Sequence, residues 1–321
     1  MASATYPGGS GSIGNKTNAD KFVPEIWSDE IIASYKKSLV MANLVNKMTM
    51  RGKKGDTLHI PSPTRGAAFA KAANTAVTIQ ANVESEVQVT INKHYEYSRL
   101  IEDIVEVQAL ASLRRFYTED AGYALSAQVD TDLIQIGRLF NGSHAAGATG
   151  DYSVSGTTTA YIGGDGTTAF VGGAGAGNAT ALTDAAIRRS IQRLDDGDVP
   201  MTDRFLIVPP SARNTLMGIA RFTEQAFVGE QGGGNTIRNG QIGDIYGVKV
   251  FVSTNADTPT TTTNRIALLA HKDAFVLAEQ MGVRSQTQYK QEYLGTLFTS
   301  DMLYGVAELR DGSAVALAVP A

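Results

Sequence analysis

Cysteine is absent from all 321 residues of this chain. Its absence excludes disulfide frameworks, thiolate zinc sites, iron–sulfur clusters and cysteine nucleophiles. The folded state must therefore be stabilised by side-chain packing and strand pairing alone.

Long hydrophobic runs and a strong charge of either sign are also missing. No run approaches the ~18 apolar residues of a membrane-spanning helix, and Met1–Asp20 lacks the apolar centre of a secretion signal. We therefore expect a cytosolic product with no membrane segment. Lys and Arg number 28 against 32 Asp and Glu, a net charge of −4, which disfavours a dedicated nucleic-acid-binding protein.

The composition is otherwise that of a folded chain with long connections. Hydrophobic residues make up 43%, whereas charged residues, at 19%, fall below the ~25% of typical soluble domains. Glycine accounts for 33 residues, about a tenth of the chain where about 7% is usual. The length allows one large domain or two of ordinary size.

Nucleotide-binding motifs are not matched. Gly9–Thr17 has some residues of a phosphate-binding loop, but Asn15 separates Gly14 from Lys16 and no strand precedes it. Gly172–Gly177 follows a β-like piece and precedes a helix, yet its spacing does not produce G-x-G-x-x-G. We interpret the first segment as a tail and the second as a flexible loop.

Metal and catalytic groupings are not evident either. The four histidines, His59, His94, His144 and His271, are scattered without ligand spacing. Asp195, Asp196 and Asp198 lack the spacing of a calcium loop, so a helix-ending turn explains them, and no G-x-S-x-G motif occurs. The sequence predicts no enzyme, no cofactor and no metal.

The most informative segment is Val77–Ile91, where odd positions are apolar and even positions polar, with Ser85 the exception. This period of two predicts a strand with one covered face. Fifteen residues at ~3.3 Å each span about 50 Å. A second extended piece, Thr57–Ile60, precedes it, with Pro61 and Pro63 between them. We predict a long hairpin-like ribbon.

A small domain is only about 30 Å across, so part of such a ribbon must project. Exposed strand edges promote aggregation unless covered, and a neighbouring copy could cover them. The alternative is a local sheet with solvated charges. The candidate residues for contacts between subunits are the basic residues of the incoming limb, the acidic residues of the returning limb and a tryptophan in the first helix: Arg51, Lys53, Lys54, Arg65, Lys71, Glu84, Glu86 and Trp27.

Elsewhere the periodicities predict alternating helices and strands. Helices are expected over Trp27–Met50, Ser112–Phe140 with a bend at Gly122, Thr183–Leu194, Ser211–Ile219 and near Gln291–Met302. Strands are expected over Arg204–Val208, Val248–Val252, Ile266–Leu269, Phe275–Glu279, Gly305–Leu309 and Val315–Val319. The Gly-rich stretch Asn141–Thr180 is predicted to be an insertion or surface loop, with β-like pieces at Thr159–Ile162 and Thr167–Val171.

The order of these elements resembles the major capsid protein of tailed double-stranded-DNA phages, which has the HK97-like fold. Three phrases carry the likeness: Phe22–Ser28, Arg204–Pro210 and Ile242–Val250. The resemblance implies an α+β fold with an N-terminal arm and helix (1–50), an extended loop (51–100), a peripheral domain with a spine helix (101–203), an axial domain core (204–255) and shared return strands and helix (256–321). It also implies that the axial loops, with Gly232, Gly233, Gly234 and Arg238 as candidates, meet at capsomer centres.

By the same resemblance, the chain would self-assemble into pentamers and hexamers of a virion head, in the host cytoplasm. Partners would be a separate scaffolding protein, because no coiled coil precedes the ribbon, a portal protein, in some relatives a decoration or cement protein, and packaged double-stranded DNA through weak non-specific contact. An encapsulin-like shell has the same fold and stays open. So do a non-viral shell or adhesive surface protein and a nucleotide-binding α/β enzyme using Gly172–Gly177.

Overall fold

The computed structural model describes residues 40–52, 54–63, 66–77, 79–80, 84–102, 112–138, 140, 160–171, 177–219, 243–258 and 264–321. These residues form three sheets, of four, six and two strands. No described helix is long and apolar enough to cross a membrane.

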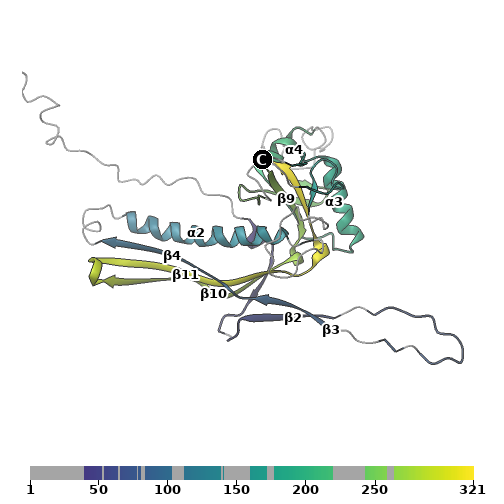
Figure 1. Cartoon of the computed structure of the whole chain (residues 1–321), viewed down its shortest axis with the longest axis horizontal. Helices are drawn as coiled ribbons and strands as arrows, with labels where there is room; N and C mark the ends of the chain where they lie inside the picture. The colour runs from purple at the N-terminus through teal and green to yellow at the C-terminus, as the bar shows by residue number, and fades with distance from the viewer. Residues whose placement is uncertain are drawn as a thin grey trace, which may run out of the picture.

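The four-stranded sheet is long and narrow, in the order β1-β10-β11-β4. Strands β10 (Phe275–Lys290) and β11 (Gly295–Glu308) form an antiparallel hairpin. The short β1 (Asn46–Thr49) pairs parallel with the start of β10, and β4 (Lys93–Glu102) pairs antiparallel with β11. Helix α2 (Ser112–Gln135), continued by the 3-10 turn η3 (Ile136–Arg138), lies along this sheet (Figure 1).

The six-stranded sheet has the order β5-β12-β9-β6-β8-β7. Its strands are β5 (Ala160–Ile162), β6 (Arg204–Val208), β7 (Asp244–Ile245), β8 (Val248–Val252), β9 (Asn264–His271) and β12 (Ala314–Pro320). Helices α3 (Asp184–Asp196) and α4 (Pro210–Met217) pack against it. Thr183 caps α3, because its hydroxyl accepts the N–H of Ala186 at 3.3 Å.

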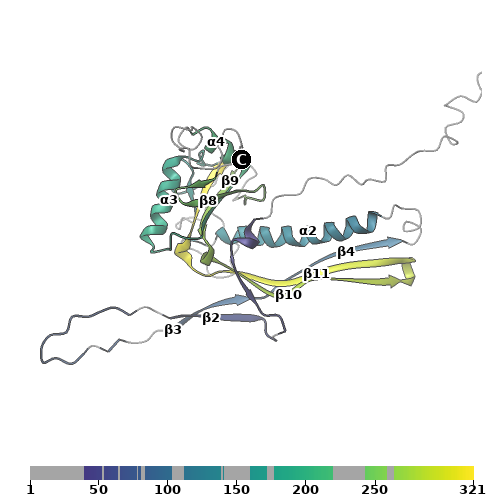
Figure 2. The same ribbon diagram turned by 180° about the vertical axis from the view of Figure 1, so that it is seen from behind.

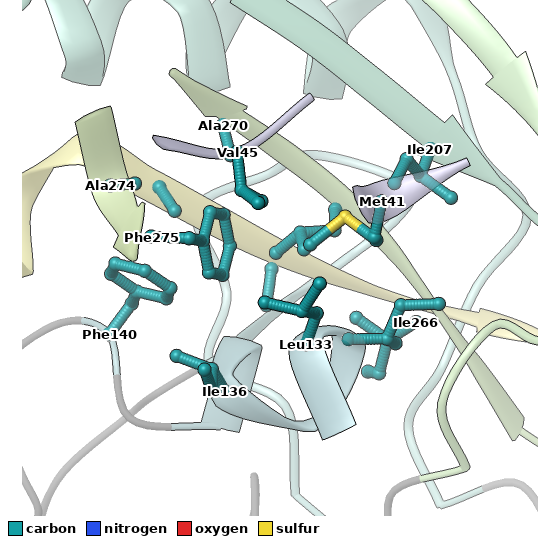
Figure 3. Close-up of a cluster of buried hydrophobic side chains, with 14 of the residues drawn as sticks. Met41, Val45, Leu133, Ile136, Phe140, Ile207, Ile266, Ala270, Ala274 and Phe275 are labelled. Carbon is teal, nitrogen blue, oxygen red and sulfur yellow. The ribbon is translucent and has the colours of Figure 1, made fainter. Parts of the chain in front are cut away.

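The largest hydrophobic cluster joins the two larger sheets through the end of α2. Leu133 and Ile136 meet Phe275 of β10 and Ile266 of β9 there (Figure 3). The rings of Phe140 and Phe275 pack edge to face, with centroids 5.0 Å apart. This cluster fixes the direction in which the long sheet leaves the six-stranded sheet.

The predicted first helix is wrong where the structure describes it. Residues 40–50 form the 3-10 turn η2 (Met41–Asn43) and strand β1 instead of helix, and the first part of the predicted range lies outside the described residues. The apolar spacing suited a helix, but parallel pairing of β1 with Val276–Glu279 of β10 outweighs that local preference.

The predicted helix near Gln291–Met302 is also wrong. Only the 3-10 turn η5 (Gln291–Tyr293) is helical, and the rest belongs to β11. The strands expected at Phe275–Glu279 and Gly305–Leu309 are parts of β10 and β11. Strand β4 (Lys93–Glu102) was not predicted.

The other expected elements are present, except that the β-like piece at Thr167–Val171 contains only an isolated bridge, from Ala169 to Tyr161. Helices α2, α3 and α4 and strands β6, β8, β9 and β12 match the predicted ranges to within a few residues, and Gly122 does not interrupt α2. The Gly-rich stretch is more than a surface loop, because Ala160 and Phe170 are buried in the main core. Residues 141–159 and 172–176 of that stretch lie outside the described residues.

Candidate assembly surface

The third sheet is a projecting ribbon, which we define as β2 (Thr57–Pro63), β3 (Glu84–Thr90) and the loop between them. The two strands pair antiparallel from Thr57 opposite Thr90 to Pro63 opposite Glu84. Figures 1 and 2 show the ribbon extending away from the rest of the molecule, on the side opposite the β10–β11 turn. The predicted projection is therefore confirmed.

Among the described residues, the contacts that anchor the ribbon lie at its base. Met50, Val89 and Ile91 form a buried cluster with Val276 and Ala278 of β10. The N–H of Met50 donates to the Glu279 carbonyl at 2.9 Å. Close backbone packing adds to this, because a Cβ placed on Gly305 of β11 would overlap the Thr90 carbonyl oxygen. The base is thus rigidly held on the long sheet.

The predicted strand Val77–Ile91 is wrong at the described residues of its first half, because Val77, Ile79 and Gln80 are not in a strand. Its second half, Glu84–Thr90, is a strand, and there the alternation holds, because Val89 and the following Ile91 are buried on the base cluster. Val77 and Ile79, in contrast, are 67% and 90% exposed. The described part of the chain thus supplies no cover for the apolar positions nearer the tip.

The described loop residues are all exposed, including Phe69 at 61%. The loop nevertheless has internal structure. The Gln80 side chain accepts the Ala67 N–H at 3.1 Å and donates to the Ala67 carbonyl, so it bridges the two limbs. The loop therefore presents small apolar residues and one aromatic ring on a defined backbone.

In the register of the ribbon Glu84 stands opposite Pro63 and Glu86 opposite Pro61, so neither position directly faces a basic candidate residue. Glu86 instead lies 3.0 Å from Nδ1 of His59. Hydrogen bonds, first from Gln88 and then from His59, lower the pKa of Glu86.

Among the basic candidates, Arg51 Nη2 lies 2.5 Å from Glu279 Oε1 of β10. Lys54 and Lys71 are exposed. The remaining candidates, Lys53, Arg65, Trp27, Gly232, Gly233, Gly234 and Arg238, lie outside the described residues.

Sequence reasoning missed three aspartates, one in the long four-stranded sheet and two in α2, that connect distant segments of the chain. The first, Asp301 of β11, accepts two hydrogen bonds from Arg284 of β10, at 2.7 and 2.9 Å, and lies 3.1 Å from Nε2 of His94 on β4. These bonds, chiefly those from Arg284, lower the pKa of Asp301 to about 2. One carboxylate therefore ties together three strands of the long sheet.

The other two aspartates are buried in α2. Asp132 accepts the Tyr304 hydroxyl at 2.7 Å and lies 3.0 Å from Lys93 Nζ, which fixes α2 to β11 and β4. Burial, followed by the bond to Asp132, raises the pKa of Tyr304 far above its ordinary value. Asp130 accepts the N–H groups of Val40 and Met41, at 3.1 and 2.8 Å. The sequence signal that could have identified them is the position of these acidic residues next to the buried apolar residues of α2.

Of the groups considered for metal or catalytic roles, Asp195 and the histidines His59, His94 and His271 have structural contacts. Asp195, in the predicted helix-ending turn, lies 2.7 Å from Nη2 of the buried Arg204. His271 Nδ1 accepts the Asp273 N–H at 3.1 Å. Within the described ranges no three His, Asp or Glu side chains are grouped to hold a metal ion.

The comparisons with known proteins agree with this architecture. A family model described as "Phage capsid protein" matches residues 38–318. No curated protein sequence matches the chain.

Solved structures match along nearly the whole length. One from Mycobacterium phage Che8 is 22% identical, with a TM-score of 0.69, and the match covers 92% of this chain and 97% of that one. The capsid of cyanophage P-SCSP1u is 18% identical, with a TM-score of 0.72 and 98% of each chain covered. A structure from Gordonia phage Cozz is 16% identical, with a TM-score of 0.65 and 99% of each covered.

These matches agree with the α+β HK97-like capsid fold. The family match favours a phage shell protein over an encapsulin-like shell, an adhesive surface protein or a nucleotide-binding enzyme. The chain belongs to the phage capsid protein family and is a structural major capsid protein of a bacteriophage head, not an enzyme.

Proposed function

We propose that this chain assembles into pentameric and hexameric capsomers of an icosahedral head, and that the ribbon of each copy lies over an adjacent copy. The observation that carries the proposal is the exposure of Phe69, Val77 and Ile79 on a ribbon whose base is anchored on the long sheet. Apolar side chains exposed on a projecting two-stranded element favour association with a surface that covers them.

The energetics favour repeated apolar contacts over ion pairs. If the ribbon buries ~500 Å² of apolar surface on a neighbour, the gain is about 12 kcal/mol before ordering costs. Exposed ion pairs contribute only ~0.2 to 1 kcal/mol each. Arg51, Lys54, Lys71 and Glu86 would therefore set the register between copies more than the strength of the contact.

The division into arm, extended loop, peripheral domain, axial core and return strands belongs to this proposal, with the boundaries that the sequence resemblance implies. So do the capsomer-centre role of Gly232–Gly234 and Arg238 and the contact roles of Trp27, Lys53, Arg65 and Glu84. Assembly would take place in the host cytoplasm. It would use a separate scaffolding protein and a portal protein, and a cement protein could be added.

The test is to remove the loop but keep its base. Because Pro63 stands directly opposite Glu84, residues 64–83 can be replaced by Asn-Gly, a two-residue turn that suits a hairpin. We expect a soluble subunit with unchanged secondary structure that elutes as small species, where the unaltered chain, expressed with the same head proteins, forms closed particles.

A second variant keeps the loop length and replaces Phe69, Val77 and Ile79 with serine. We expect it to lower particle yield as well, because the apolar side chains that would contact the adjacent copy are lost. Normal shells from both variants, by size exclusion and negative-stain microscopy, would refute the proposal.

A further inference from the structure

One glutamine side chain joins the two limbs of the exposed ribbon loop. Oε1 of Gln80 accepts the N–H of Ala67 at 3.1 Å, and Nε2 of Gln80 donates to the Ala67 carbonyl. A primary amide can do both because it carries a donor and an acceptor side by side. We call this pair of hydrogen bonds the amide bridge.

The residue before Ala67 leaves room for the amide bridge. A Cβ placed on Gly66 would lie only 2.8 Å from Oε1 of Gln80. A side chain at position 66 would therefore push the Gln80 amide away from Ala67. The bridge thus depends on a long amide side chain on one limb and on a glycine, which permits close approach to its backbone, on the other.

The amide bridge shortens the part of the loop that is free to move. Strand pairing in the ribbon ends at Pro63 opposite Glu84, so the loop between the strands runs from 64 to 83. The bridge closes it at Ala67 and Gln80, which leaves only residues 68–79 between its ends. Closing the loop there removes backbone conformations that an open loop would sample.

The tip beyond the bridge is also held by its own hydrogen bonds. The hydroxyl of Thr75 donates to the Ala72 carbonyl at 2.8 Å. Asn74 turns the chain there with φ 60°, a left-handed conformation that asparagine tolerates. All described loop residues are exposed, so burial does not order this segment.

The bridge encloses the three apolar side chains on which the proposed contact depends. Phe69, Val77 and Ile79 all lie between its two ends and are 61%, 67% and 90% exposed. A loop that is ordered before it meets its partner loses less conformational entropy on docking. An exposed bridge of this kind therefore favours association without contributing to the core of the subunit.

We propose that Gln80 is a positioning residue for assembly, because the amide bridge holds the ribbon loop in its docking conformation in the free subunit. The inference rests on the proposed contact between the ribbon and an adjacent copy. Gln80 acts through the backbone of the loop, and the apolar side chains make the contact.

Two variants break the bridge in different ways. Gln80→Ala removes the amide, and Gly66→Ala displaces it. Both subunits should melt at the temperature of the unaltered chain, whereas the lowest subunit concentration that yields closed particles should rise roughly fivefold or more. Gln88→Ala is the matched control, because the exposed Gln88 amide bonds at 2.6 Å to Glu86 on its own strand and joins no limbs. Its assembly concentration should stay unchanged.

Gln80→Glu adds a pH profile. Its carboxylate can accept the Ala67 N–H but has no proton to donate to the Ala67 carbonyl, whereas the protonated acid can do both. Particle yield relative to the unaltered chain should be low at pH 7 and rise as the pH falls toward about 4.5. The relative yield of Gln80→Ala should not change over that range.

Hydrogen exchange of the free subunit tests the bridge without assembly. The Ala67 N–H should exchange about tenfold more slowly in the unaltered chain than in Gln80→Ala or Gly66→Ala. Equal exchange rates, a lower melting temperature of either variant, or an unchanged assembly concentration in both would overturn the inference. If the unaltered chain forms no shells, or if the variant without residues 64–83 forms them, the proposed function fails instead.

Discussion

The carboxylate of Asp130 accepts the backbone N–H of Met41 at 2.8 Å, between residues 89 positions apart in the chain. Asp130 is completely buried, and its second oxygen accepts the Asn255 side-chain amide at 3.0 Å. One side chain of α2 therefore fixes both the entry of the chain into the core and the segment after β8.

Asp130→Ala should destabilise the subunit by on the order of 3 to 5 kcal/mol, because it leaves two backbone N–H groups and the Asn255 amide without their buried acceptor. Asp130→Asn should cost less, since one oxygen remains to accept the backbone N–H groups. Urea unfolding of soluble subunits measures both. Equal stability of the alanine variant and the unaltered chain would show that these bonds do not hold the segment.

Two glycines should respond in opposite ways to alanine. Gly305→Ala should lower stability by about 1 to 3 kcal/mol, because the added methyl group meets the fixed carbonyl of Thr90 at the ribbon base. Gly122→Ala should raise stability by about 0.5 to 1 kcal/mol, because it adds a helix former inside α2 with no atom within 4 Å of the new Cβ. Thermal melting of the two variants side by side tests this contrast.

Acid should weaken the long sheet through Asp301. Arg284 lowers the pKa of Asp301 to about 2 from an ordinary value of 3.8, so the folded state binds its proton less readily than the unfolded state. The resulting stability is present above about pH 4 and is lost as the pH falls from about 4 to about 2.

Arg284→Gln should remove most of this contribution, which is small because the Arg284 side chain is 53% exposed and solvent screens the pair. The difference from the unaltered chain should shrink as the pH falls through that window. Urea midpoints measured across the window show whether it does; a constant difference would assign the loss to packing of the arginine stem.

Glu308 should act in the opposite direction. Burial, followed by the nearby Asp311, raises the pKa of Glu308 from 4.5 to about 8. The folded state therefore holds the proton more tightly than the unfolded state, and stability falls as the pH rises from about 4.5 to about 8. Glu308→Gln should be neutral near pH 5 and stabilising above pH 8, on the order of 2 kcal/mol. A melting-temperature difference that does not change with pH would contradict this assignment.

The inner surface of a capsid needs little affinity for the packaged DNA. With a net charge of −4, the purified subunit should show negligible retention of double-stranded DNA at physiological salt. A submicromolar dissociation constant in a filter-binding assay under those conditions would contradict weak, non-specific contact.

Local periodicity correctly predicted the elements in which the spacing of apolar residues fits either a helix or a strand, but not both. The stripe around Leu133 defined α2, and the alternation through Val89 and Ile91 defined β3 and its projection. The same alternation overextended the strand, because Val77 and Ile79 are apolar without being covered by their own chain. An apolar pattern indicates that a side chain will be buried, but it does not tell whether its own chain or another molecule buries it.

The long hairpin was beyond this reasoning because the outer part of its first strand, β10, has no buried face. Ser285–Gln288 are all polar and exposed, so no period of two marks them as a strand. Their conformation is set by pairing with Phe298 and its neighbours on β11. Strand β11 in turn pairs with β4, which the sequence pattern did not predict.

By itself, the amino-acid sequence determined the absence of metal-binding and redox cysteines, the long helix and the existence of a ribbon, because each depends on composition or on contacts that repeat along one element. Only the tertiary structure decided which strands became partners, where Asp130, Asp132 and Asp301 found theirs, and that Gln80 bonds to Ala67 across the ribbon loop. The physical reason is that hydrogen bonds and burial between distant segments outweigh local propensities of a few tenths of a kcal/mol per residue.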